Sequence, residues 1–334
     1  MTAHTALVIP DVLVGRAAEL RVLRTVLDRT ALGVPSLVLI DGEEGIGKTS
    51  LARHFLATNG IATVLVAAGD AAEHQLPFGI VEQLTGDATR SATTSGDPLS
   101  VGAALLQAVS ASAGGVTAVL VDDAQWADRQ SLRAISFAVR RLRRDPVLVL
   151  VLTRDAASLP DGLRREVLTL HRLHVALSGL TAAEVGELGA RLGVGTLTRA
   201  EARRLHSHTQ GNPLFAGALF QELTAAELRR VDGQLPAPRS FAVMVLERLA
   251  GCGAGARGLA EAAAGLPLRA PLRLLAEVAA VADPAAALDE LVGAGLVRTE
   301  QSFGEMGVAS FRHPLIGVSI RAALTVARRR ELNV

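Results

Sequence analysis

Apolar residues in the first half of the chain fall into short continuous runs. Residues 36–42, 62–68, 118–121 and 147–153 are rich in Val, Leu and Ala, a pattern typical of strands buried on both faces of a parallel sheet. Segments with helical periodicity lie between these runs, and an amphipathic helix is expected over residues 16–29. A fifth, weaker strand is expected near residues 174–177. Alternating strands and helices predict an α/β domain whose parallel sheet carries helices on both faces.

The second half of the chain differs from the first in its composition and periodicity. From about residue 178, Ala, Leu, Glu and Arg recur at helical spacing. Residues 231–240 contain two prolines and one glycine and form the best linker candidate. The chain therefore divides into an α/β domain over 1–177, a small helical domain over 178–235 and a third, mostly helical domain over 236–334. Helices are expected at 181–192, where Thr181-Ala-Ala-Glu184 forms a capping-box sequence, and at 199–208, 213–223, 240–250, 256–264 and 270–281, with short strands near 291–298 and 308–311.

A phosphate-binding motif follows the first predicted strand. Residues 42–49 read Gly-Glu-Glu-Gly-Ile-Gly-Lys-Thr, which fits G-x-x-x-x-G-K-[ST] between a strand and a helix. Backbone N–H groups and the helix N-terminus favour phosphate oxygens, Lys48 suits the terminal phosphates, and Thr49 offers a hydroxyl to Mg²⁺. Lys48 is the only lysine of the chain, which favours a nucleotide site over a plain glycine-rich turn. The expected nucleotide-binding residues here are Gly42, Gly45, Ile46, Gly47, Lys48, Thr49 and Ser50.

Two more strand ends carry charges suited to phosphate chemistry. Asp122 and Asp123 follow the third predicted strand; Asp122 would hold Mg²⁺, and Asp123 would orient or polarise an attacking water. The alternative for such a pair is a turn or helix cap. Arg154 closes the fourth strand, at the carboxyl edge where open parallel sheets bind ligands, and is a candidate sensor of the γ-phosphate. Its alternative is a surface ion pair with Asp155, while Trp126 is expected to have a packing role.

Composition narrows the class of protein. The 334 residues include 34 Lys+Arg and 33 Asp+Glu, for a net charge of +1, and 49% are hydrophobic, which is typical of a folded chain and unlike a nucleic-acid-coating protein. One cysteine excludes an intramolecular disulfide and paired-cysteine metal sites. The N-terminus lacks the pattern of a signal peptide. The uncharged stretch 98–121 is interpreted as helix, turn and buried strand, so we expect a cytoplasmic protein without membrane segments.

Six segments form a recognisable set when they are taken together. They are Val14-Gly-Arg-Ala-Ala-Glu19 and residues 41–50, 76–84, 121–128, 210–215 and 311–315. Together they resemble the N-terminal ATPase region of the large LuxR-type, MalT-like transcriptional regulators, which belong to the AAA+-like STAND class of signal-transduction ATPases. The resemblance extends from about residue 10 to about residue 330. It implies a P-loop NTPase fold followed by a helical lid domain over 178–235 and a winged-helix-like domain over 236–334, with ATP or ADP and Mg²⁺ clamped between them.

The resemblance also implies roles for three residues outside the phosphate loop. Arg16 would lie near the adenine, Pro213 would pack on the base, and His313 would contact the phosphate of ADP in the resting state. Each residue has an alternative interpretation from the sequence. Arg16 would be a charge at a helix N-terminus, Pro213 would mark the start of a helix, and His313 would be a core histidine whose ring nitrogens are satisfied by the protein.

The function that the resemblance implies is an ATP-driven switch. ATP would favour an open form able to associate into homo-oligomers, and slow hydrolysis to ADP would restore a closed form, since a ligand shifts conformations only by its preference between them. The alternative is a scaffold that holds nucleotide structurally, and a P-loop kinase fits less well because the paired aspartates suit a switch. Regulators of this kind continue into sensor repeats and a helix-turn-helix that this sequence lacks, so we expect no direct DNA binding by this chain. The arginine runs at 140–144 and 328–330 are interpreted as solvated helix faces.

Overall fold

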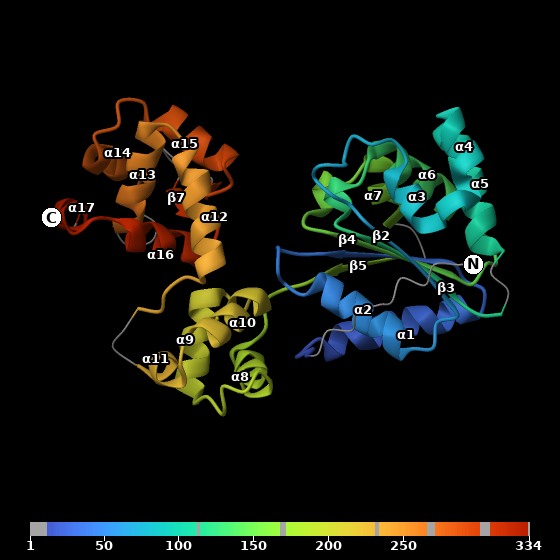
Figure 1. The fold of residues 1–334 in the computed structure, drawn as a ribbon, viewed down its shortest axis with the longest axis horizontal. Helices are drawn as coiled ribbons and strands as arrows, with labels where there is room; N and C mark the ends of the chain where they lie inside the picture. Colours follow the sequence, from blue (N-terminus) through green and yellow to red (C-terminus); the bar gives the residue numbers. More distant parts are fainter. Residues whose placement is uncertain are drawn as a thin grey trace. The chain divides into compact units, whose positions relative to one another are not determined.

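The computed structural model describes residues 12–111, 114–167, 172–230, 234–265, 271–300 and 308–332. The chain forms two compact units, Met1–Gly179 and Leu180–Val334 (Figure 1). The boundary between them lies two residues beyond the boundary that we predicted from the sequence. The second predicted boundary, at residue 235, falls inside the second unit, so the division of that unit into a lid and a winged helix stays a prediction.

The first unit is built on a parallel sheet of five strands. They are β1 (Ser36–Asp41), β2 (Thr63–Ala68), β3 (Thr117–Asp122), β4 (Val147–Thr153) and β5 (Arg172–Ala176). Their order in the sheet is β2-β3-β4-β1-β5, and each neighbouring pair is parallel. The predicted α/β sheet is therefore confirmed. Because β1 pairs with both β4 and β5, it is an inner strand of the sheet. The loop that follows β1 therefore lies at the carboxyl edge with a strand on either side.

Helices cover both faces of this sheet. One face packs against α1 (Ala17–Ala31) and α2 (Lys48–Thr58), and the other against α3 (Gly79–Thr85), α4 (Arg90–Ser95), α5 (Pro98–Ser110), α6 (Arg129–Arg141) and α7 (Asp161–Val167) (Figure 1). Within β1, Val38 and Ile40 belong to the first core, whereas Leu37 and Leu39 belong to the second. Successive side chains of a strand point to opposite faces. Burial on both faces explains why the strands are continuous apolar runs.

The second unit is mostly helical. Its helices are α8 (Ala182–Arg191), α9 (Arg199–Thr209), α10 (Pro213–Glu222), α11 (Ala225–Arg229), α12 (Arg239–Ala250), α13 (Ala254–Gly265), α14 (Leu272–Ala279), α15 (Pro284–Gly293), α16 (Pro314–Ala323) and α17 (Val326–Leu332), and its strands are β6 (Val297–Glu300) and β7 (Val308–Phe311). β6 and β7 pair antiparallel. The strand expected at 291–298 is wrong over residues 291–296, because residues 291–293 end α15 and residues 294–296 form the turn before β6. The helices α11, α15, α16 and α17 are not among the predicted ones.

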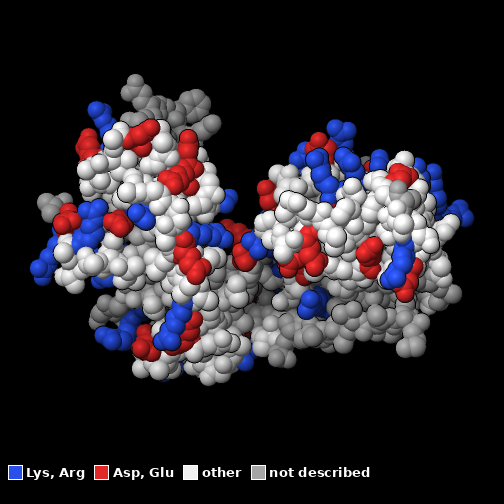
Figure 2. All heavy atoms as spheres, turned by 45° about the horizontal axis from the view of Figure 1, so that its top comes forward, with Lys and Arg blue, Asp and Glu red and all other residues white. Residues whose placement is uncertain are grey.

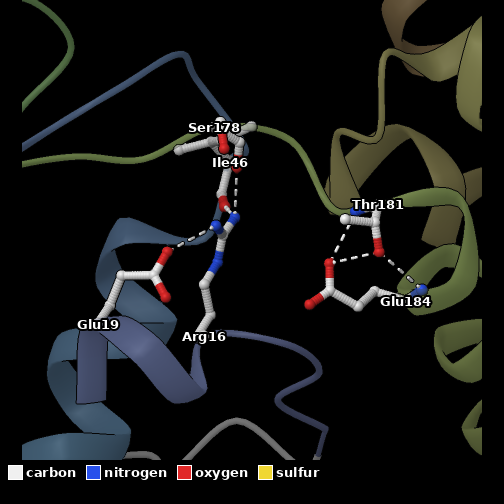
Figure 3. Close-up of polar contacts among 6 residues, drawn as sticks. All are labelled: Arg16, Glu19, Ile46, Ser178, Thr181 and Glu184. Carbon is white, nitrogen blue, oxygen red and sulfur yellow. Dashed lines mark hydrogen bonds and ion pairs between the residues drawn. The ribbon is translucent and has the colours of Figure 1, made fainter. Parts of the chain in front are cut away.

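The capping box predicted at Thr181 is present. Thr181 Oγ1 accepts a hydrogen bond from the backbone N–H of Glu184, and the Glu184 carboxylate accepts the backbone N–H of Thr181 at 2.7 Å (Figure 3). The same arrangement starts α9 at Thr198 and α11 at Thr224. Each box satisfies N–H groups that a helix leaves unpaired at its first turn. These helices therefore begin where the local sequence specifies.

The surface of the chain mixes the two signs of charge. Figure 2 shows Lys and Arg side chains interspersed with Asp and Glu on the face that it draws. In the described ranges, no helix is both long enough and apolar enough to span a bilayer. Within the uncharged stretch, residues 98–110 form α5 and residues 117–121 lie in β3, as we interpreted them from the sequence.

Candidate functional site

The loop between β1 and α2 has the backbone that phosphate binding requires. Gly42, Gly45 and Gly47 have φ values of 150°, 75° and 98°, which glycine adopts readily and other residues avoid. A Cβ at Gly42 would lie 2.8 Å from the carbonyl oxygen of Leu177. Because Gly47 is the N-cap residue and has no side chain, the first N–H groups of α2 remain available to phosphate oxygens. Buried Ile46 anchors the loop in the core, and Ser50 stands in the first turn of α2.

The Lys48 side chain lies folded over this loop. Its Nζ donates hydrogen bonds to the carbonyl oxygens of Gly42 at 2.7 Å and Glu43 at 2.9 Å. Burial is the main cause that lowers the pKa of Lys48, and Asp123 opposes it. Backbone carbonyls solvate an ammonium without neutralising its charge. The position is therefore suited to an anionic phosphate.

Thr49 and Asp122 meet as the predicted metal site requires. Thr49 Oγ1 donates to Asp122 Oδ1 at 3.2 Å. Asp122 is buried at the end of β3, and this burial is the main cause that raises its pKa. Mg²⁺ in phosphate-transfer sites takes one or two protein oxygens and completes its shell with phosphates and water. The pair fits such an ion, whereas the described residues contain no cluster of three or more His, Cys, Asp or Glu that could form an all-protein site.

Asp123 and Arg154 are joined by a residue that the sequence analysis did not single out. Gln125 Nε2 donates to Asp123 Oδ1 at 2.7 Å, and Gln125 Oε1 accepts the backbone N–H of Arg154 at 3.0 Å. Arg154 Nη1 pairs at 2.7 Å with Glu44 Oε2 of the phosphate loop. The alternative of a pair with Asp155 is wrong, since Asp155 caps the following turn. Arg154 thus lies beside the phosphate loop.

Two of the six segments, 76–84 and 121–128, meet at a buried carboxylate. Asp128 accepts the backbone N–H groups of Phe78 at 2.9 Å and Ile80 at 3.4 Å. The same carboxylate caps α6 through the N–H of Ser131 at 2.8 Å. Phe78 has a φ of 64°, a strained value that these bonds help to hold. The contact fixes the start of α3 against the loop that follows β3.

That loop is also pressed closely against the end of β2. A Cβ at Gly69 would lie 2.5 Å from the carbonyl oxygen of Asp123 and 2.8 Å from the backbone nitrogen of Ala127. Only glycine fits there without displacing the loop. Trp126, which ends the short 3₁₀ helix η2 (Ala124–Trp126), is 37% exposed. Ala124 of the same turn lies in the core and Ala127 packs against it, so Trp126 lies at the edge of the core and its packing role stays a prediction.

Arg16 fastens the segment 14–19 to the phosphate loop. It is the N-cap residue of α1, has a φ of 65° and is 7% exposed. Its Nη2 donates to the carbonyl oxygens of Ile46 and Ser178, both at 2.8 Å, and its Nη1 pairs with Glu19 at 3.3 Å (Figure 3). The interpretation of Arg16 as only a helix-terminal charge is wrong, because it bridges two distant segments. Its place near an adenine stays a prediction.

Pro213 and His313 lie in the second unit. Pro213 is the first residue of α10, and His313 is the buried N-cap residue of α16. His313 Nδ1 accepts the backbone N–H of Leu315 at 3.1 Å, so Nε2 carries the proton that bonds the carbonyl oxygen of Thr209 at 3.2 Å. The ring of Phe215 packs edge-on at 5.0 Å, and burial lowers the pKa of His313. Both ring nitrogens have protein partners here, and the nucleotide contacts of Pro213 and His313 stay predictions.

The sheet and its carboxyl edge define a class of protein. A parallel five-stranded sheet with a glycine-rich phosphate loop after β1 and aspartates after β3 is the P-loop NTPase fold. Residues 12–151, which are less than half of the chain, match the family model described as an AAA ATPase domain. No curated protein sequence matches the chain.

Solved structures with the same fold include three that align along nearly the whole chain. The Walker-type ATPase PABY2304 of Pyrococcus abyssi has a TM-score of 0.55 at 15% identity and covers 94% of this chain and 97% of its own. The Aeropyrum pernix ORC2 protein, solved as ADPNP–ADP complexes, has a TM-score of 0.55 at 18% identity. The alignment covers 94% of this chain and 96% of the ORC2 chain. A point variant of Thermotoga maritima RuvB has a TM-score of 0.50 at 16% identity and covers 90% and 93%. At these identities the likeness shows the fold.

Proposed function

We propose that this chain is an ATP-binding, slowly ATP-hydrolysing switch module of a LuxR-type, MalT-like regulator of the STAND class. One observation carries the proposal: Lys48, the Thr49–Asp122 pair, Asp123 and Arg154 converge at one edge of one sheet. The match to an AAA ATPase domain supports it. Two proteins with this fold support it as well, one a Walker-type ATPase and the other solved as ADPNP–ADP complexes.

The proposed reaction assigns each residue a task. The phosphate loop and Lys48 bind the β- and γ-phosphates, and Mg²⁺ held by Thr49 and Asp122 would neutralise developing charge. Asp123 orients a water whose oxygen bonds to the γ-phosphorus while the bond from that phosphorus to the β–γ bridging oxygen breaks. ADP leaves, and the proton of the water passes through Asp123 to inorganic phosphate. Arg154 stabilises the charge on the transferred group.

ATP and ADP should act differently on the ion pair between Arg154 and Glu44. A γ-phosphate is a second anion for Arg154 and competes with the Glu44 carboxylate, whereas ADP lacks that group. The side chain of Arg154 is 37% exposed and that of Glu44 is 54% exposed, so the pair contributes little to stability and exchanges readily. ATP and ADP therefore favour different positions of Arg154. A nucleotide that binds one position of Arg154 more tightly than the other shifts the protein toward the corresponding conformation, as a switch requires.

The first experiment is to denature freshly purified protein and to identify the nucleotide that is released. Near-equimolar ADP, followed by slow release of phosphate from added ATP, is the expected result. Tightly held ADP that never exchanges, with no turnover, would favour the scaffold instead. Transfer of the γ-phosphoryl group to an acceptor other than water would favour a kinase.

Lys48 offers a direct check of the binding site. Because Lys48 is the only lysine, an amine-reactive reagent can modify only this side chain and the α-amino group. We expect ATP or ADP to protect Lys48 from modification, as measured by mass spectrometry of the peptides, and Lys48→Ala to abolish binding. Unchanged ATP affinity in Lys48→Ala would show that the site is assigned wrongly.

Homo-oligomerisation in the ATP state and the absence of direct DNA binding belong to the same proposal. Size-exclusion chromatography with light scattering should show a larger species with a non-hydrolysable ATP analogue than with ADP. A gel-shift experiment at physiological salt should show no sequence-specific retention. A specific DNA complex formed by this chain would contradict the second expectation.

A further inference from the structure

Gln125 connects the two strand ends on which the proposed hydrolysis depends. Its amide nitrogen donates to Asp123 Oδ1 at 2.7 Å at the end of β3. Its amide oxygen accepts the backbone N–H of Arg154 at 3.0 Å at the end of β4. These two strands are hydrogen-bonded neighbours in the sheet, so one side chain spans the gap between their carboxyl ends.

The chemistry of the two contacts requires an amide. The carboxylate of Asp123 can only accept a hydrogen bond, and the backbone N–H of Arg154 can only donate one. A Gln side chain offers both functions from one planar group. A glutamate would still accept from Arg154, but it would bring a second carboxylate against Asp123, and an alanine would remove both bonds.

The contact also restricts Asp123. This residue has a φ of 46°, so its backbone is in a strained left-handed conformation, and it is only half-buried. Among the described residues, Gln125 is the side chain that donates to its carboxylate. With Oδ1 bound to the amide, the lone pairs of Oδ2 can be directed at a water.

We infer that Gln125 is a positioning residue, which holds the Asp123 carboxylate in the orientation that activates water and sets that carboxylate at a fixed distance from Arg154. This inference rests on the proposed function. Gln125 itself does not bind the nucleotide. Its loss should therefore lower kcat and leave nucleotide affinity in place.

The test compares Gln125→Ala and Gln125→Glu with the wild type in steady-state phosphate release and in ATP binding. General acid–base groups contribute about 10²–10⁴-fold, so losing only the orientation of one should lower kcat about 10- to 100-fold. KM and the Kd for ATP should stay within about 3-fold. Gln130→Glu, the same chemical change on the nearby helix α6, is the matched control and should retain wild-type turnover.

A double-mutant cycle separates positioning from general support of the fold. If Gln125 acts through Asp123, Gln125→Ala should lower kcat in the wild-type background and have no further effect in Asp123→Ala. If Gln125 only stabilises the structure, its loss should lower the thermal midpoint, weaken ATP binding and reduce the residual rate of Asp123→Ala as well. Those results would overturn the inference.

The outcomes distinguish this inference from the function on which it rests. Wild-type protein that binds ATP without turnover would refute the proposed hydrolysis and the role of Gln125 together. Wild-type turnover with an unchanged kcat in Gln125→Ala would refute only the role of Gln125. Slow wild-type turnover can be measured in single-turnover mode with γ-labelled ATP.

Discussion

Replacing Arg16 should destabilise the first unit even when no nucleotide is bound. In the structure its guanidinium joins three segments that are distant in the sequence: the start of α1, the phosphate loop at Ile46 and the segment after β5 at Ser178 (Figure 3). Arg16→Ala leaves two inward-facing carbonyl oxygens without their donor. A residue that only contacts adenine would leave the stability of the free chain unchanged.

The magnitude follows from the two bonds. Hydrogen bonds from charged groups contribute about 1.5–3 kcal/mol each, and ordering an arginine side chain costs about 2 kcal/mol. The net loss in Arg16→Ala is therefore about 1–4 kcal/mol in the free energy of unfolding. Because residue 16 has a φ of 65°, Arg16→Gly removes the same bonds but should be about 1 kcal/mol less destabilising than Arg16→Ala.

The single tryptophan provides the assay. Trp126 is the only tryptophan of the chain and lies in the first unit, so its fluorescence in a urea titration follows the unfolding of that unit. Arg21→Ala, on the exposed side of α1, is the matched control and should change the free energy of unfolding by less than about 0.5 kcal/mol.

Two outcomes would refute this reasoning. An Arg16→Ala protein with wild-type stability but weaker ADP binding would show that the arginine serves the nucleotide rather than the loop. Equal destabilisation by alanine and glycine would show that residue 16 does not keep its left-handed backbone in solution.

Two further predictions concern a close backbone contact and a buried histidine. Gly69→Ala forces a Cβ against the carbonyl oxygen of Asp123, so it should destabilise the first unit by about 1–3 kcal/mol and lower ATP turnover. Gly162→Ala is the control, because its Cβ makes only ordinary contact, and it should have neither effect. Equal effects of the two substitutions would contradict the close contact at Gly69. Burial lowers the pKa of both His313 and His208. As the pH falls, these histidines are therefore protonated in the unfolded chain at a higher pH than in the folded chain. Stability should be constant above about pH 6.5 and fall at lower pH by up to about 1.4 kcal/mol per pH unit for each group. His313→Asn, which keeps a side-chain acceptor for the first turn of α16, should reduce the loss measured by calorimetry between pH 7.5 and pH 5.5, and an unchanged loss would exclude the histidine as its source.

The sequence predicted the sheet and the phosphate loop well because both are encoded locally. Apolar runs of strand length specify burial on two faces, and the loop at 42–49 depends on glycines and a helix start that lie next to one another. The capping box at Thr181 is equally local. The same four-residue signature precedes the predicted helix at 199–208, and at Thr224 it would have located one more helix start. The predicted strand near 291–298 was misplaced because short apolar runs fit a strand or the end of a helix equally well.

The sequence by itself determined which residues are candidates for the proposed chemistry, and only the tertiary structure decided which of them meet. Arg16 bonds Ile46, Asp128 bonds the 76–84 segment, and Gln125 bridges Asp123 and Arg154. These contacts join residues on separate strands or loops, and the order of the strands in the sheet brings them together. A periodicity or a motif has a range of a few residues, whereas the distance between two strand ends depends on how the whole sheet and its helices pack. For this reason the sequence placed Gln125 in the segment 121–128 without a role. Only the folded chain brings it within hydrogen-bonding distance of both Asp123 and the backbone of Arg154.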